Sequence, residues 1–382
     1  MRDAVIVEAI RTPVGKRNGG LSNVEPADLS AHTLRALVNR TGIDPRLVDD
    51  VVWGCVGQVG EQSMDIGRNA VLAAGWPESV PGVSIDRQCG SSQQALSFAA
   101  ASVIAGHYEV AVAGGVESMS RVTMGSSALD QFPFGQGFRA RYGPHVVPNQ
   151  GIGAELIGQH WKVSRNQADE FALTSHEKAA RAQDEGRFGN EIIPIVTPDG
   201  EKVVTDEGVR RGGTLETLAN LRPAFKDDGI VTAANSSQIS DGASATLVMT
   251  SERAHELGLV PLVRVHTCVV VGDDPIMMLT GPIPATARAL QRSGLSLADI
   301  GVFEVNEAFA VVPIAWLAET GADPKRLNPN GGAIALGHPL GGSGTRLTST
   351  LIHHMRENNL RYGLQTMCEG GGQANATVFE LL

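Results

Sequence analysis

Short runs of β-branched residues alternate along the chain with longer alanine- and leucine-rich stretches at helical spacing. In the first half this pattern predicts strands over 4–7, 51–55, 83–86 and 110–113, and helices over 28–38 and 94–105. In the second half it predicts strands over 300–305 and 364–367, and helices over 284–291 and 344–355. Such alternation is typical of an α/β protein.

The two halves also share short sequence patterns, which predict an internal duplication. Segment 42–52 resembles segment 294–302, since each has a glycine followed by an Asp-containing turn and a short apolar run. Segment 112–115 parallels segment 367–371, because both are strand ends that open into glycines. The alternative is that βα units resemble one another on physical grounds alone.

An insertion separates the duplicated parts of the first half. Segment 121–153 is rich in Gly, Pro and aromatic residues, among them Phe132, Phe134 and Phe138. A helix follows, and Ser164 with Gln167 three residues later forms a predicted capping box at its start. Segment 203–241 is polar and irregular before a strand resumes over 243–249. The predicted domains are an N-terminal half (1–118 with 240–260), a loop domain (119–239) and a C-terminal half (261–382).

Composition narrows the function classes. The 382 residues include 31 Lys and Arg against 41 Asp and Glu, and the net charge of −10 argues against nucleic-acid binding. Four cysteines are too few for a disulfide scaffold and indicate a reducing compartment. The segment 1–9 resembles neither a signal nor a transit peptide, and the apolar stretch 308–318 is too short to span a bilayer. We therefore expect a cytoplasmic protein with no membrane partner.

Cys89 is the first candidate for chemistry, because it stands between a predicted strand and a predicted helix. A thiol at a helix N-terminus faces the positive end of the helix dipole, which lowers its pKa and raises its thiolate content. Gly90 beside it permits access. The alternative is a buried structural cysteine, which is the commoner fate of a free cysteine.

His338 is a candidate base, since it lies in the glycine-rich segment 328–344. A histidine among so many small residues is unlike a solvated surface histidine, and an acid/base or oxyanion-donor role fits it. A phosphate-binding role for the glycines is less supported, because the segment matches no established phosphate-loop pattern. No cluster of His, Cys and carboxylates has the spacing of metal ligands, so no metal is expected.

Two further polar groups end apolar strands. Cys368 precedes Glu369 and three consecutive glycines, whose N–H groups can converge on an anion, and a proton donor and acceptor role suits it. Asn306 follows an apolar strand, where it could hold a water or an oxyanion or instead cap a helix. Cys55 and Cys268 lie in valine-rich strands and are interpreted as structural.

These segments together resemble the thiolase family over essentially the full chain. The motifs that carry the resemblance are 9–16, 54–58, Cys89-Gly90-Ser91, Asn306-Glu307-Ala308-Phe309, 331–339 ending in Gly337-His338-Pro339, and Cys368 with Gly370-Gly371-Gly372. The resemblance implies the thiolase fold, in which two duplicated βαβαβαββ halves form a five-layered α-β-α-β-α core. It also implies that the inserted loop domain covers the active site and CoA.

The same resemblance assigns roles to the candidates. It makes Cys89 the acylated nucleophile, His338 its activator and Cys368 the residue that shuttles a proton. It places one oxyanion hole at His338 and an Asn306-held water, and another at the N–H groups of Cys89 and Gly370. The CoA contacts that it implies are Arg210, Phe225, Ala233, Ser237 and Phe309. It further implies acyl-CoA and CoA as binding partners, CoA as a co-substrate with no bound cofactor, and a homodimer or homotetramer.

The reaction implied is cleavage of a 3-ketoacyl-CoA by CoA into acetyl-CoA and a shortened acyl-CoA, which in reverse is a Claisen condensation. Three segments depart from the short-chain biosynthetic pattern: 149–151, 235–238 and 373–375. The last two, together with segment 87–94, resemble thiolases of bacterial lipid and sterol breakdown, which predicts a bulky or longer acyl group. Two alternatives are a β-ketoacyl synthase-like condensing enzyme, which would have no second catalytic cysteine such as Cys368, and a non-catalytic CoA- or lipid-binding protein.

Overall fold

The computed structural model describes residues 2–131 and 133–382, so Phe132 of the predicted loop region lies outside the described residues. The helices are α1 (Pro26–Thr41), α2 (Ile66–Ala73), α3 (Ser91–Ala105), α4 (Gln136–Tyr142), α5 (Gln150–His160), α6 (Arg165–Asp184), α7 (Leu215–Ala219), α8 (Ser251–Glu256), α9 (Pro282–Ser293), α10 (Val311–Thr320), α11 (Ala333–Leu336) and α12 (Ser343–Glu357). The strands are β1 (Val5–Arg11), β2 (Gly15–Lys16), β3 (Asp50–Gly54), β4 (Gly82–Ile85), β5 (Val110–Ser118), β6 (Ile195–Val196), β7 (Lys202–Val203), β8 (Ser240–Met249), β9 (Val263–Gly272), β10 (Val302–Val305), β11 (Tyr362–Glu369) and β12 (Gln373–Leu381).

The strand order repeats itself between the two halves. In the first half, β4 and β3 are parallel, β3 and β5 are parallel, and β5, β8 and β1 follow in antiparallel pairs. In the second half, the backbone at Leu327 pairs in parallel with Phe303 of β10, and β10 pairs in parallel with β11. Antiparallel β12 and β9 complete that half. Matching order and direction support the duplication.

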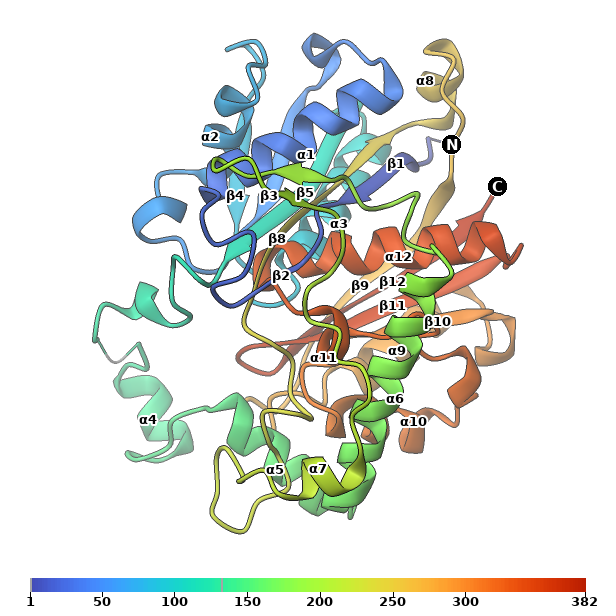
Figure 1. Cartoon of the computed structure of the whole chain (residues 1–382). Helices are drawn as coiled ribbons and strands as arrows, with labels where there is room; N and C mark the ends of the chain where they lie inside the picture. The colour runs from blue at the N-terminus through green and yellow to red at the C-terminus, as the bar shows by residue number, and fades with distance from the viewer. Residues whose placement is uncertain (1, 132) are drawn as a thin grey trace.

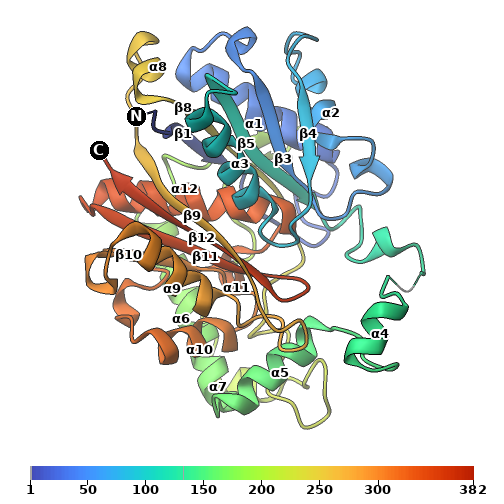
Figure 2. The same cartoon turned by 180° about the vertical axis from the view of Figure 1, so that it is seen from behind.

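The halves are stacked as five layers. The strands of both halves form one large sheet, which is continuous because β1 pairs with β9. Apolar residues of α1 and α2 pack on one face of its first-half part, and those of α9 and α10 pack on the far face of its second-half part. Between these two parts, α3 and α12 share one core with strands of both halves. Both cartoon views show these two helices in the middle of the molecule, with the two ends of the chain close together (Figures 1 and 2). This is the α-β-α-β-α core that the resemblance to the thiolases implies.

Small residues let the two central helices approach closely. Gly344 of α12 lies directly against the backbone of Gln93 on α3, where no side chain could fit. The N–H of Thr345 donates to Ser92 Oγ at 3.0 Å across the same contact. Because α3 follows Cys89 and α12 follows His338, this helix pair brings the segments of both residues together.

The inserted segment builds its own elements. Between the end of β5 and the start of β8, its described residues form α4 to α7 and the small β6–β7 sheet. None of these elements is a strand of the large sheet, but Ile192 forms an isolated parallel bridge with Arg11 of β1. The predicted capping box at Ser164 and Gln167 is confirmed at the start of α6. That helix lies along the second half in Figure 1, where Lys178 Nζ donates to Leu327 O at 2.8 Å. Across the described ranges, no helix is both long and apolar enough to cross a membrane.

Candidate active site

Cys89 sits on a strained turn between β4 and α3. The residue before it, Gln88, has a φ of 50°, a left-handed conformation that non-glycine residues rarely adopt. The turn is held by Asp86, whose Oδ1 accepts from the Gln88 N–H at 2.6 Å, and by Gln88 O, which accepts from the Ser91 N–H at 3.0 Å. The thiol is therefore presented immediately before the first turn of α3.

The predicted lowering of the Cys89 pKa is wrong. Burial raises the pKa of the thiol to about 12, and the nearby carboxyl of Glu369 raises it further. Desolvation of the thiolate has a larger effect on the pKa than the helix N-terminus has. Removing a charge from water costs more free energy than the partial positive charge of a helix dipole contributes. In the free protein Cys89 is consequently a neutral thiol at physiological pH.

Cys368 occupies the end of β11, fully buried and opposite Ala374 of β12. Burial raises its pKa, and an electrostatic interaction with Cys89 raises it further, so the two thiols face the same site. The glycine turn that follows contacts the Cys89 turn, since a side chain at Gly370 would lie 2.7 Å from Gln88 Oε1.

Two backbone donors point to an anion site at this junction. Within the described part of the chain, neither the N–H of Cys89 nor that of Gly370 donates a hydrogen bond to another residue, and the Cys89 N–H acts only on its own thiol. Both residues are partly buried, and N–H groups withdrawn from water are nearly always paired in folded proteins. A pair of free donors beside a thiol is the arrangement that stabilises an oxyanion formed on the atom attacked by that thiol.

His338 is fixed in one tautomer by its neighbours. Ser343 Oγ donates its only proton to Pro339 O at 2.8 Å, so it accepts from His338 Nδ1–H at 2.6 Å. Nε2 then carries the lone pair. The pKa of His338 is lowered to about 3, first by burial and then by the positive charge of Arg346. The imidazole is thus neutral, with Nε2 available to take a proton.

Asn306 completes the polar group around His338. Its Nδ2 lies 3.4 Å from His338 Nε2, and its backbone N–H donates to Thr366 O at 3.0 Å. Its Oδ1 is buried and has no hydrogen-bond partner among the residues described. Asn306 is not a helix cap, because α10 begins only at Val311. The amide instead directs its Nδ2–H toward the lone pair of His338 Nε2 and leaves Oδ1 as a buried, unpaired acceptor.

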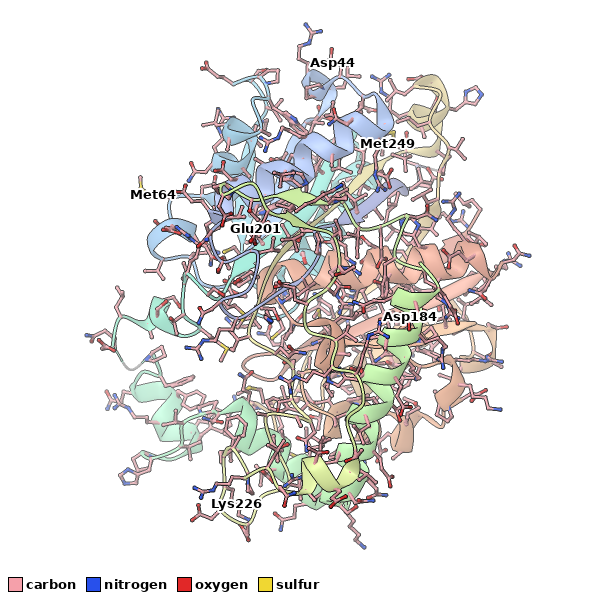
Figure 3. The ribbon with its side chains drawn as sticks, in the orientation of Figure 1. Asp44, Met64, Asp184, Glu201, Lys226 and Met249 are labelled. Atoms are coloured by element: carbon pink, nitrogen blue, oxygen red, sulfur yellow. The ribbon has the colours of Figure 1, made fainter. Side chains whose placement is uncertain are left out.

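A cavity of about 150 Å³ opens onto His338. Three of the five predicted CoA contacts line it, namely Phe225, Ser237 and Phe309. The other lining residues are Met119, Met124, Gln150, Ser236, Gln238, Ile239, Ala308 and Leu340. Phe225 comes from the loop beside α5 and α7 on which Figure 3 labels the next residue, Lys226. The inserted segment therefore supplies one wall of the cavity and the second half the other.

The remaining two predicted CoA contacts lie elsewhere. Arg210 lines a separate cavity, where its backbone N–H donates to His176 Nδ1 at 3.1 Å. Ala233 is exposed and lines none of these cavities. Among residues 2–131 and 133–382, no group of His, Cys, Asp and Glu side chains is arranged to hold a metal ion.

Comparison with known families decides the membership. Residues 4–252 match the model of the thiolase N-terminal domain, and residues 259–381 match that of the thiolase C-terminal domain. The chain belongs to the thiolase family.

The relatives that align over their full length are named 3-ketoacyl-CoA thiolases. The steroid 3-ketoacyl-CoA thiolase FadA6 of Mycobacterium tuberculosis is 48% identical over 390 aligned residues, which cover all of this chain and 95% of that protein. The 3-ketoacyl-CoA thiolase FadA of Escherichia coli K12 is 46% identical, and that of Photobacterium profundum is 45% identical. Both of these alignments cover the whole of each chain.

Sequence reasoning missed three residues of this thiolase site. Ser343 sets the tautomer of His338, and its spacing of five residues from the histidine is a signal that the sequence carries. Gln150 faces the cavity, whereas its neighbour Asn149 caps α5 by accepting from the N–H groups of Gly151 and Ile152. Glu369 raises the pKa of Cys89, which only the folded chain reveals because the two residues are 280 positions apart.

Proposed function

We propose that this thiolase cleaves 3-ketoacyl-CoA with CoA, giving acetyl-CoA and an acyl-CoA shortened by two carbons. The observation that carries the proposal is the pair of electrostatically coupled thiols, Cys89 and Cys368, beside the free N–H groups of Cys89 and Gly370. The full-length 3-ketoacyl-CoA thiolase relatives support the same reaction.

In the first half-reaction, Cys89 gives its proton to His338 Nε2 and attacks the 3-keto carbon. The N–H groups of Cys89 and Gly370 stabilise the resulting oxyanion. The bond between C2 and C3 then breaks, which leaves Cys89 acylated and releases the enolate of acetyl-CoA. The protonated His338 and a water held by Asn306 stabilise the enolate oxygen, and Cys368 protonates the enolate carbon.

In the second half-reaction, the Cys368 thiolate takes the proton from the thiol of incoming CoA. The CoA thiolate attacks the acyl group on Cys89, and the collapse of the tetrahedral intermediate expels Cys89 as a thiolate. His338 returns its proton to that thiolate, which restores the starting state. Thiols suit both roles because each can give up a proton and take one back. Cys89 exchanges its proton with His338, and Cys368 protonates the enolate carbon and then takes the proton of the CoA thiol.

The competing functions fit the site less well. A β-ketoacyl synthase-like enzyme has no task for the buried Cys368 that is coupled to Cys89. A non-catalytic CoA- or lipid-binding protein has no need for a strained turn at Gln88 or for a histidine whose tautomer leaves the lone pair on Nε2.

The acyl group is proposed to be long or bulky. Gln150 and Met124 stand at the cavity wall with a 3.7 Å contact between Gln150 Nε2 and Met124 Sδ, and both come from the inserted segment, which shapes that wall. The steroid thiolase among the relatives supports such a substrate.

The test is CoA-dependent cleavage of acetoacetyl-CoA, a long-chain 3-ketoacyl-CoA and a steroidal 3-ketoacyl-CoA. Cleavage of none of them would contradict the function, and preference for acetoacetyl-CoA would contradict the acyl group.

Self-association through the half that carries Cys89 is part of the proposal. One edge strand of the large sheet is β4, where Val83 is 40% exposed, and Phe98 on the adjoining α3 is 48% exposed. Exposed edge strands and apolar patches invite pairing with a second chain. Light scattering should give two or four times the 40.1 kDa chain mass, and a monomer would contradict this part.

Loss of the Asn306 amide should slow the reaction without unfolding the chain. Asn306→Ala is expected to lower kcat by about two to three orders of magnitude, as for removal of one oxyanion-hole donor. The measurement is steady-state thiolysis beside Asn358→Ala, which removes an exposed amide at the end of α12 and should keep normal turnover. Near-normal turnover of Asn306→Ala would show that the amide has no role at the enolate.

A further inference from the structure

Glu369 is a buried carboxyl that the proposed mechanism does not use. It is fully buried at the end of β11, next to Cys368. Because neighbouring residues of a strand point to opposite faces, its side chain is directed away from that of Cys368, and its Oε1 contacts Gly90 instead. Over the described chain, neither of its carboxyl oxygens has a side-chain hydrogen-bond partner, and only the backbone N–H of Asn375 acts on the carboxyl as a donor. An ionised carboxylate in such a place would be costly.

Two other side chains in the same cluster also carry unpaired groups. Asn375 donates from Nδ2 to Gly90 O at 3.2 Å, and its buried Oδ1 accepts no bond from any described residue. Arg87 donates from Nη1 to Gln373 Oε1 at 2.7 Å, and its Nε is likewise buried and unpaired. A neutral carboxyl supplies the O–H donor that Asn375 Oδ1 lacks, whereas an ionised one does not.

We propose that Glu369 is a proton-linked positioning residue for Cys89. In its neutral form it bonds to Asn375 and so steadies the Gly90 carbonyl, and in its ionised form its negative charge opposes formation of the Cys89 thiolate. The inference rests on Cys89 being the nucleophile of the proposed function, and it adds a group that sets the pH range over which that thiol is reactive.

The effect of the Glu369 charge on the pKa of Cys89 has the direction that the proposal requires. Burial raises the pKa of Glu369 to about 8, with Arg87 opposing this and Asp86 adding to it. Below that pH the carboxyl is neutral, and above it the carboxylate raises the pKa of Cys89. The other charged groups acting on Cys89 are Glu117 from β5 and Asp86 from its own turn. As the pH rises past about 8, the thiolate fraction of Cys89 should therefore increase less than it would beside a neutral group at position 369.

The experiment compares the alkylation rate of Cys89 by iodoacetamide between pH 6.5 and 9.5, in the wild type and in Glu369→Gln, by mass spectrometry of the peptide. The ratio of variant to wild-type rate should be near one at pH 6.5 and rise to about three- to tenfold at pH 9.5, since one pKa unit is a tenfold change in thiolate. Glu369→Asp keeps an ionisable group and should track the wild type more closely than the glutamine variant does.

Glu304→Gln is the matched control. Glu304 is also fully buried and has its pKa raised to about 8 by burial, but it is not among the charges that act on Cys89. Its variant should show a flat ratio. In the wild type alone, the alkylation profile should depart from a single ionisation near pH 8. A flat ratio for Glu369→Gln, or a single-ionisation profile in the wild type, would overturn the proposal. Because alkylation needs no turnover, failure of the thiolysis assay would not mimic either result.

Discussion

Cys89→Ala should abolish thiolysis, with kcat falling about a millionfold, as when a covalent nucleophile is removed from a hydrolase. The physical reason is that no other described thiol stands on the turn beside the free N–H groups of Cys89 and Gly370. Intact-mass spectrometry after brief mixing with the preferred 3-ketoacyl-CoA should show one added acyl group on the wild type and none on the variant.

The control for this result is a cysteine outside the site. Cys268 lies on β9, partly buried, and Cys268→Ala should keep both the acyl adduct and the turnover. Cys368→Ala should behave differently from both. It leaves Cys89 free to attack but removes the donor that protonates the enolate, so net thiolysis should fall steeply. An acyl adduct that persists in Cys89→Ala would assign the nucleophile elsewhere.

Much of the fold could be predicted from local pattern because the relevant signals are local. The runs that predict β3, β5 and α3 are short-range, and Ser164 with Gln167 marks the start of α6 within one helical turn. The matching strand order supports the duplication, but one local signal for it is wrong. Strand β11 ends at Glu369 before its glycines, whereas Gly114 and Gly115 lie inside β5, where they pair with β3 and β8. Helix α5 is less regular in sequence, and its start depends on Asn149 as a cap within a glycine-rich stretch.

The electrostatics of the site could not be predicted in the same way. The pKa of Cys89 depends on burial under the second half of the chain and on Glu369, neither of which appears in the segment around the cysteine. The helix N-terminus is a local feature, and local reasoning therefore assigned the shift the wrong sign. Likewise, the separation of Arg210 from the cavity of Phe225 follows from how the irregular loop folds back on α6, which spacing does not determine.

His338→Ala should lower the rate of Cys89 acylation by about a thousandfold, within the range for loss of a general base. Burial disfavours both an isolated thiolate and an isolated imidazolium, as the raised pKa of Cys89 and the lowered pKa of His338 show. The two charges therefore form together, as the proton passes to Nε2 and the sulfur attacks carbon. Without the imidazole, the thiol has no nearby acceptor, and single-turnover acylation followed by quenched mass spectrometry measures the loss.

The pH dependence separates a base with this pKa from an ordinary histidine. With a pKa of about 3, His338 is neutral and fully competent from pH 5 upward, so kcat/KM should show no acid limb near pH 6.5. Ser343→Ala keeps the imidazole but leaves Nδ1–H without its acceptor, which should cost about tenfold in acylation rate, the effect of one unpaired buried donor. An acid limb near 6.5 in the wild type would show that the pKa of His338 is not lowered in this way. An unchanged acylation rate in Ser343→Ala would show that another group sets the tautomer of His338.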